Sequence, residues 1–379
     1  MKDVENRCWV EIDLDMIRQN YRIYRRQLRP GQAIMAVVKA DAYGHGDHEV
    51  TKALLEEGCR HFAVSNIQEA LNVRALSDQA EILILGYTPP AYFHTLSEQG
   101  ISQAVLSEEY AALLASCGEP IRCQFALDTG MNRIGLDADD PLDCERVIRS
   151  YSGQLSVEGL FTHLCVADSA DPEQISFTKQ QIQKFRAVAD AVRDLALPDI
   201  HCLNTAGGLW HNEYGNLVRL GISLYGLKPD YENRLPEGIE PALTWKSVVS
   251  MVKQVHPGET IGYGRSFSVR REMTVATVPT GYADGYSRHL SNCGEVLLCG
   301  RRVPIVGRVC MDQLMLDVSG IPNVGIGEVV TLIGRDGGET LTADDMAQTI
   351  GTIGYEIVCA ISKRVARKFC GESTEDRSR

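Results

Sequence analysis

Short apolar runs alternate with amphipathic stretches through the first two-thirds of the chain. Eight of these runs are apolar on both faces, as strands of a parallel sheet covered on both sides must be. They span residues 34–39, 61–65, 81–86, 102–106, 122–128, 157–163, 200–204 and 217–223. Apolar residues recur at helical spacing between them, for example in 175–192 and after Asp13, which can cap a helix. Eight β–α units within roughly 200 residues predict a (β/α)8 TIM barrel rather than a doubly wound open sheet.

The pattern changes near residue 240, where alternating β-branched stretches broken by Gly and Pro predict a mostly antiparallel β domain. A helix is expected near 342–350, and the three prolines of 229–241 mark a linker. The run at 8–13 has no place in an eight-stranded barrel and is a candidate to pair with the second domain. We therefore assign residues 1–235 to the barrel and 236–379 to the β domain, which ends in a polar tail from residue 371.

Composition narrows the class of protein further. The net charge of -12 and the absence of a basic stripe argue against nucleic acid or an anionic membrane surface as partner. The N-terminus lacks the apolar region of a signal peptide, and no apolar window is long enough to span a membrane. Twelve scattered cysteines without a Cys-x-x-Cys pair indicate free thiols in a reducing, cytoplasmic compartment, and no metal site is predicted.

One lysine stands where barrel enzymes place catalytic groups. Lys39 ends an apolar strand in the segment AVVKADAYGHG, residues 36–46. A lysine in an apolar pocket can form a Schiff base, because burial lowers its pKa. The glycines and Tyr43 that follow would let the loop approach a phosphate group. The alternative is a strand-end lysine that reaches solvent.

This segment resembles the lysine motif of the alanine racemase family, which depends on pyridoxal 5'-phosphate (PLP) and has PLP fold type III. Further blocks resemble the family in its own order through nearly the whole chain. They are ALDTGMNRIG (126–135), FTH (161–163), LNTAGG (203–208), VRLGISLYG (218–226), IGYGRSF (261–267), GYADGYSR (281–288) and GRVCMDQLMLDV (307–318). Each block is moderately specific, and the ordered set is very specific.

The resemblance implies how PLP is bound. Lys39 would hold it covalently, and the phosphate cradle would consist of Tyr43, Thr205, Gly221 and Ile222, with Thr205 in place of a more usual serine. Arg219 would face the pyridine nitrogen. A guanidinium stays protonated, so it disfavours a second positive charge on that nitrogen.

Racemisation needs proton exchange on both faces of a planar intermediate, which one residue cannot easily reach. The resemblance implies that Tyr263 is the acid/base opposite Lys39 and that His163 links this tyrosine towards Arg219. In the family the second domain reaches the active site of the other subunit, so a homodimer with composite sites is implied. Arg133, Tyr282 and Met311 match residues that bind the substrate or line its entry.

Two positions depart from the family pattern. Ala126 stands where a lysine often becomes carbamylated and orders the arginine that matches Arg133, so another group must hold Arg133. Lys363, in ISKRVAR (361–367), stands where many members carry a tyrosine close to the phosphate and the substrate. We assign Lys363 to the cofactor site, although this departure leaves the substrate preference open.

The function implied is interconversion of L- and D-alanine by a cytoplasmic enzyme that supplies D-alanine for peptidoglycan. A serine or broader small amino-acid racemase is the alternative of the same chemistry, because 161–169 faintly resembles serine racemases of vancomycin-resistance systems. A non-catalytic PLP-binding barrel is the alternative of another class, but such proteins resemble the barrel half only. A PLP decarboxylase does not match the blocks around Tyr263 and Met311.

Overall fold

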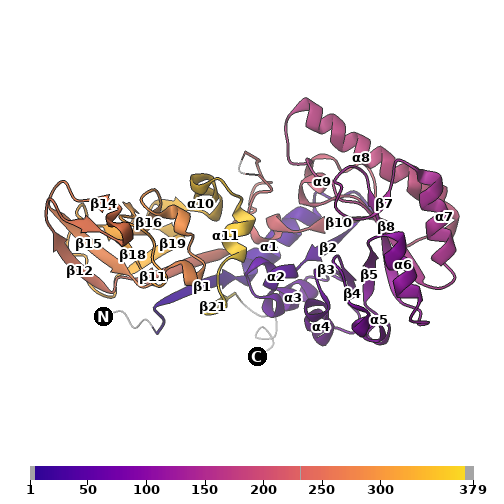
Figure 1. Ribbon diagram of the computed structural model, residues 1–379, viewed down its shortest axis with the longest axis horizontal. Coiled ribbons are helices and arrows are strands. Elements are labelled where there is room, and N and C mark those ends of the chain that lie inside the picture. The colour runs from indigo at the N-terminus through magenta and orange to yellow at the C-terminus, as the bar shows by residue number, and fades with distance from the viewer. Residues whose placement is uncertain (1–4, 231, 372–379) are drawn as a thin grey trace.

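Eight parallel strands form a barrel in the computed structural model, which describes residues 5–230 and 232–371 (Figure 1). In order around the barrel they are β10 (Leu217–Leu220), β2 (Ala33–Val37), β3 (His61–Val64), β4 (Glu81–Ile84), β5 (Ser102–Val105), β6 (Arg122–Asp128), β8 (Ser156–Phe161) and β9 (Asp199–His201). A parallel bridge between Leu203 and Val218 brings the last strand back to the first. The sequence-based prediction of the eight strands and of the barrel is confirmed.

Helices cover the outside of the barrel (Figure 1). They are α1 (Leu14–Arg25), α3 (Asp47–Glu56), α4 (Ile67–Leu76), α5 (Phe93–Glu98), α6 (Glu108–Ala115), α7 (Pro141–Tyr151), α8 (Pro172–Ala191) and α9 (Thr205–Trp210). Asp13 caps α1 as predicted, since its carboxylate accepts a hydrogen bond of 2.9 Å from the Met16 amide. A two-residue strand, β7 (Leu136–Asp137), pairs with the end of β6.

The second region is built around antiparallel sheets, as predicted. Its strands are β11 (Leu243–Val248), β12 (Met251–Val255), β13 (Thr260–Ile261), β14 (Phe267–Ser268), β15 (Met273–Val278), β16 (Glu295–Leu298), β17 (Arg301–Pro304), β18 (Leu314–Asp317), β19 (Val329–Asp336), β20 (Glu339–Leu341) and β21 (Ala366–Cys370). Two helices, α10 (Ala343–Ile350) and α11 (Gly354–Cys359), lie between this region and the barrel (Figure 1).

The first strand of the chain, β1 (Cys8–Asp13), belongs to this second region. It pairs antiparallel with β11 and parallel with β21. Both ends of the described chain therefore meet in one sheet, beside the barrel rather than within it. The polar tail expected from residue 371 lies, after Gly371, outside the described residues. No helix within the described residues is long and apolar enough to cross a membrane.

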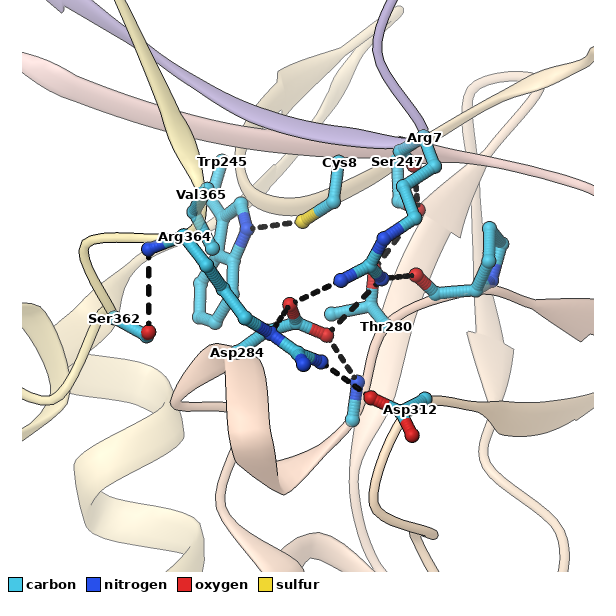
Figure 2. A network of polar contacts seen from close by, with 12 residues as sticks. Arg7, Cys8, Trp245, Ser247, Thr280, Asp284, Asp312, Ser362, Arg364 and Val365 are labelled. Carbon is cyan, nitrogen blue, oxygen red and sulfur yellow. Dashed lines mark hydrogen bonds and ion pairs between the residues drawn. The ribbon is translucent and has the colours of Figure 1, made fainter.

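A buried carboxylate fixes a turn of the second region (Figure 2). Asp284 ends the short helix η5 (Tyr282–Asp284), and its side chain is fully buried. It accepts hydrogen bonds from Arg7 (2.7 Å), from Arg364 (2.7 Å) and from the Gly281 amide (3.0 Å). The guanidinium of Arg364 also pairs with Asp312. The network therefore joins the start of β1, the η5 turn and the segment before β21.

We expect Asp284→Asn to lower the free energy of unfolding by about 2 to 3 kcal/mol at neutral pH, because two guanidinium groups lose a buried partner. Burial by itself would raise the pKa of Asp284, but the hydrogen bonds from Arg364, Arg7 and Gly281 outweigh burial and lower it below the ordinary value of an aspartate. The carboxylate therefore stabilises the fold above the unfolded-state pKa, and this contribution is lost as the pH falls through the lower, folded-state pKa.

Urea unfolding at about pH 7 and about pH 3 measures both effects, since the gap between the variant and the wild type should narrow at the lower pH. Asp312→Asn is the matched control, because the Asp312 side chain is 55% exposed and its ion pair should contribute little. Equal losses in the two variants would contradict a special role for Asp284.

Candidate active site

One cavity of about 710 Å³ opens at the carboxyl ends of the barrel strands. Eight of the residues assigned from the sequence line it: Lys39, Tyr43, Arg133, His163, Thr205, Arg219, Gly221 and Ile222. Most of them lie within four residues of the end of a strand, namely β2, β8, β9 or β10. Because parallel strands end at the same rim of a barrel, residues far apart in the sequence meet there.

The turn that follows Lys39 is left-handed. Ala40, Asp41, Ala42 and Tyr43 have φ angles of 54°, 55°, 51° and 54°, a region that L-residues avoid because Cβ crowds the carbonyl oxygen. The Glu69 carboxylate supports the turn, accepting hydrogen bonds from the amides of Ala40 (2.8 Å) and Ser65 (2.7 Å). From the sequence, the glycines and Tyr43 were expected to let this loop approach a phosphate group. The residues with positive φ directly after Lys39 are not glycines. Such strain is typical of functional sites held by their surroundings.

Lys39 carries an amine that loses its proton more readily than an ordinary lysine. Burial lowers its pKa, the charge of Arg133 lowers it further, and Arg219 adds to the effect. Glu69 acts in the opposite direction without cancelling these effects. A larger neutral fraction makes the amine a better nucleophile towards a carbonyl group.

Arg219 is buried beneath this cavity, with 3% of the residue exposed. Its guanidinium donates to His201 Nδ1 (2.6 Å) and to the Thr162 carbonyl, and lies 3.4 Å from His163 Nδ1. Burial lowers the pKa of Arg219 to about 10, so it remains protonated at neutral pH. Within residues 5–230 and 232–371, no carboxylate forms an ion pair with it.

The neighbouring histidine is held neutral. Burial and then the charges of Arg219, Arg133 and Lys39 place the pKa of His163 well below the ordinary value of a histidine. His201, whose role sequence reasoning missed, is fully buried in the same cluster. The only signal for it was a polar residue within the apolar run 200–204, a position that a buried structural histidine also occupies.

Two hydroxyl groups and one glycine border the same part of the cavity. The Thr205 Oγ1 atom accepts a hydrogen bond from the Gly221 amide (3.0 Å), which leaves its own proton free to donate. A Cβ at Gly221 would lie 3.0 Å from the Tyr43 hydroxyl and 3.7 Å from Thr205 Oγ1. A side chain there would therefore fill the space that the glycine keeps open.

Three assigned residues of the second region do not reach the cavity of their own chain. Tyr263, in the short helix η4 (Tyr263–Arg265), is 70% exposed, and Met311 and Tyr282 are 54% and 43% exposed. Figure 1 shows β14, which follows η4, at the end of the second region that lies away from the barrel. None of the three lines the cavity that holds Lys39 of the same chain.

Lys363, which the sequence analysis assigned to the cofactor site, does not line this cavity. Its side chain is exposed in the turn between α11 and β21 and is absent from the cavity lining. The residues of this segment that line the cavity are Ile353, Tyr355 and Cys359, in and beside α11. The helix ends before Lys363, so the chain has turned away from the cavity when it reaches the lysine. The structure gives the assignment to the cofactor site no support.

The other departure, Ala126, is buried and lines the cavity. The Arg133 side chain is exposed at the cavity rim, and the described part of the chain offers it no hydrogen bond or ion pair. Nothing at position 126 can therefore order this guanidinium.

The fold and this cavity define a two-part TIM-barrel protein with a strand-end lysine. Family models for the alanine racemase N-terminal and C-terminal domains match residues 12–229 and 242–369. The chain belongs to the alanine racemase family. It is 39% identical to an alanine racemase of Halothermothrix orenii, over 97% of this chain and 98% of that one.

Solved structures agree with this membership. The alanine racemase of E. faecalis is 36% identical and superposes with a TM-score of 0.90, over 97% of this chain and 99% of that one. The alanine racemase of Bartonella henselae, solved with covalently bound pyridoxal phosphate, is 28% identical with a TM-score of 0.85. That match covers 96% of this chain and 100% of the other.

We expect His163 to stay neutral between about pH 5.5 and pH 8, because its surroundings are buried and positively charged. Its ring resonances in ¹⁵N-detected NMR should not titrate across this range. His94 is the control, since it is exposed and its hydrogen bond to Glu119 raises its pKa. A His163 that titrates in parallel with His94 would contradict this reading of the cavity.

Proposed function

We propose that this protein is a PLP-dependent racemase that interconverts L- and D-alanine, acts as a homodimer in the cytoplasm and supplies D-alanine for peptidoglycan. The observation that carries the proposal is the position of Lys39. A lysine with a lowered pKa lies at a strand end, in one cavity with a buried arginine and a neutral histidine.

The residues of the cavity fit PLP. The Lys39 amine can bind its aldehyde carbon, and the pocket of Tyr43, Thr205 and Gly221 suits its phosphate. Two hydroxyl groups can donate to phosphate oxygens at that pocket. Tyr43 is itself fixed by ring contacts, with centroid separations of 5.0 Å to Tyr225 and 5.9 Å to Tyr355. A cavity of about 710 Å³ has room for the cofactor and a small amino acid.

When bound, PLP withdraws electrons from the α-carbon of an amino acid and so makes its α-hydrogen acidic. Lys39 Nζ is placed to take or return that proton on one face of the substrate. Its lowered pKa keeps part of the amine unprotonated near neutral pH, as a general base requires. Arg133, exposed at the cavity rim, offers a guanidinium to the substrate carboxylate.

Arg219 sets the electrostatics below this chemistry. Its positive charge disfavours protonation of a basic nitrogen placed against it, which limits how far the substrate carbanion is stabilised. His163 accepts no second charge in this environment. It can therefore link Arg219 to a hydroxyl group above it without becoming a cation.

The second proton carrier is Tyr263 of the partner subunit. One chain leaves Tyr263, Tyr282 and Met311 exposed and outside the lining of its own cavity. A two-fold dimer that places them at the mouth of the other chain's cavity would cover them and supply the opposite face of the substrate. Met311 and Tyr282 would then line the entry.

The cytoplasmic setting is supported by the thiols. None of the twelve cysteines forms a disulfide, and five of them are exposed, which suits a reducing compartment. The preference for alanine over serine follows from family membership. Lys363 is the residue whose departure from the family pattern left the substrate preference open, and it does not line the cavity. It therefore gives no support for serine as the substrate.

Lys39→Ala should abolish the absorbance of lysine-bound PLP and lower the rate of alanine racemisation by about a thousandfold or more. Borohydride reduction of the wild type should attach the cofactor to the peptide that contains Lys39. Lys179→Ala, an exposed position on α8, is the control and should behave as wild type. Retained activity together with a reducible cofactor bond in Lys39→Ala would refute the assignment.

Tyr263→Phe should lower racemisation by about a hundredfold or more while leaving PLP bound, because one face of the substrate loses its proton carrier. Tyr92→Phe, an exposed tyrosine of the barrel half, is the control.

Mixing the Lys39→Ala and Tyr263→Phe proteins tests the composite site. After subunit exchange, each hybrid dimer contains one site with both native residues, so activity should return to about a quarter of the wild-type value. No recovery despite demonstrated exchange would show that Tyr263 does not act across the dimer.

A further inference from the structure

A chain of hydrogen bonds runs from Arg219 into the barrel interior. The guanidinium Nη1 donates to His201 Nδ1 (2.6 Å), and His201 Nε2 lies 2.7 Å from the Gln124 side-chain oxygen. The Gln124 amide nitrogen donates to Asp199 Oδ2 (2.7 Å). His201 and Gln124 are buried, and Asp199 is half-buried. The chain starts at a guanidinium of the cavity that has no carboxylate against it within the described residues.

The chemistry of the four groups gives this chain a single direction. A guanidinium can only donate, so His201 Nδ1 must accept. A neutral imidazole then carries its proton on Nε2 and donates to the oxygen of Gln124. The amide therefore turns its NH2 group towards Asp199, whose carboxylate accepts. Every bond points from the buried cation to the acid.

The strand register of the barrel brings the members of this hydrogen-bond chain together. Gln124 on β6 is in register with Gly159 on β8, and Gly159 is in register with Asp199 on β9. A Cβ at Gly159 would lie 2.7 Å from the Asp199 Cβ and 2.3 Å from its carbonyl oxygen. The missing side chain therefore lets Asp199 lie close against β8, the strand that separates it from Gln124.

An aromatic ring holds the other end of the chain. Phe161 stacks on the His201 ring with a centroid separation of 5.4 Å and an interplanar angle of 9°. The Arg219 guanidinium carbon lies 5.7 Å from the centre of the same ring. One flat side chain therefore orients both members of the bond between arginine and histidine.

We propose that Gln124 and Asp199 are positioning residues for Arg219, and that Asp199 is its remote counter-ion. They fix His201 as the neutral tautomer with its proton on Nε2, which holds the guanidinium charged and in one orientation below the cavity. A carboxylate in direct contact would neutralise the positive field that the cavity receives. A buried cation without any counter-ion would destabilise the fold. A polarised chain of hydrogen bonds to a distant acid avoids both this destabilisation and the loss of the positive field. The effect on racemisation rests on the proposed function.

The first test reads the tautomer directly and does not depend on activity. Histidine ring nitrogens of the PLP-loaded protein are observed by ¹⁵N NMR, and His201 is assigned with a His201→Asn variant. We expect a proton on Nε2 and none on Nδ1 between about pH 6 and pH 9. In Gln124→Met, which keeps the volume but removes both hydrogen bonds, the Nε2 proton should shift upfield. A wild-type His201 protonated on Nδ1, or an unchanged Nε2 proton in Gln124→Met, overturns the proposal.

The second test measures the consequence. Gln124→Met should lower kcat/KM for alanine about tenfold at unchanged PLP content. Gln103→Met is the matched control and should stay within about twofold, since Gln103 is a fully buried glutamine on the neighbouring strand β5 that lies outside the chain.

A double variant separates positioning from packing. In Gln124→Glu the introduced carboxylate faces Asp199, and activity should fall. Adding Asp199→Asn lets the asparagine NH2 group donate to the introduced carboxylate, which still accepts from His201. Racemisation and the Nε2 tautomer should then recover to near wild type. A folded double variant that is no better than Gln124→Glu would refute the proposal. If the wild type shows the tautomer but racemises no amino acid, the proposed function fails and the hydrogen-bond chain stands.

Discussion

The buried guanidinium of Arg219 is the constraint on which the rest of the cavity depends. A charge in such a place must be compensated or it will be lost. Here burial lowers its pKa only to about 10, so the charge persists at neutral pH. Its field contributes to the low pKa of His163, of His201 and of Lys39. This cation thus adds to the effect of burial, which keeps two histidines neutral and favours the free amine that the proposed chemistry needs.

The lysine itself is placed by a second constraint, which is backbone strain. Four successive residues with positive φ swing the chain back so that both Lys39 and Tyr43 line the same cavity. Neither alanine nor tyrosine favours this conformation, so the surrounding contacts must impose it. The two bonds from Glu69 on α4 are the clearest of these contacts, because they tie the turn to the next β–α unit. A rigid turn keeps the Lys39 amine and the Tyr43 hydroxyl at a fixed separation.

The sequence predicted the eight barrel strands because buried parallel strands are apolar on both faces and leave no ambiguity of period. Lys39 could be proposed from its strand end, where barrel sites form, whereas His163 and Gly221 were assigned through the resemblance to the family. Three features could not be read in the same way. The left-handed turn is built by Ala40–Tyr43, whose residue types do not signal positive φ. Lys363 was placed by correspondence with a motif, whereas the end of α11 decides which side chains face the cavity. The hydrogen bond between Gln124 and Asp199 depends on strand register and on the missing Cβ at Gly159. Neither can be inferred from the amino-acid sequence alone.

The second region lines the cavity of its own chain and, in the proposed dimer, would border that of the partner subunit. Through Tyr355 and Cys359, α11 lines the cavity of its own chain, whereas Tyr282 and Met311 are exposed and outside that lining. The two sides are joined at Asp284. Its carboxylate holds the Gly281 amide, next to Tyr282, and its carbonyl oxygen accepts a hydrogen bond of 2.9 Å from the Ser362 amide, three residues beyond Cys359. In the proposed dimer, the same buried acid would therefore fix the wall of one active site and the entry of the other. In that dimer, a shift of the η5 turn would affect both active sites. The turn is bonded to the segment after α11, which lines one site, and it contains Tyr282, which borders the other.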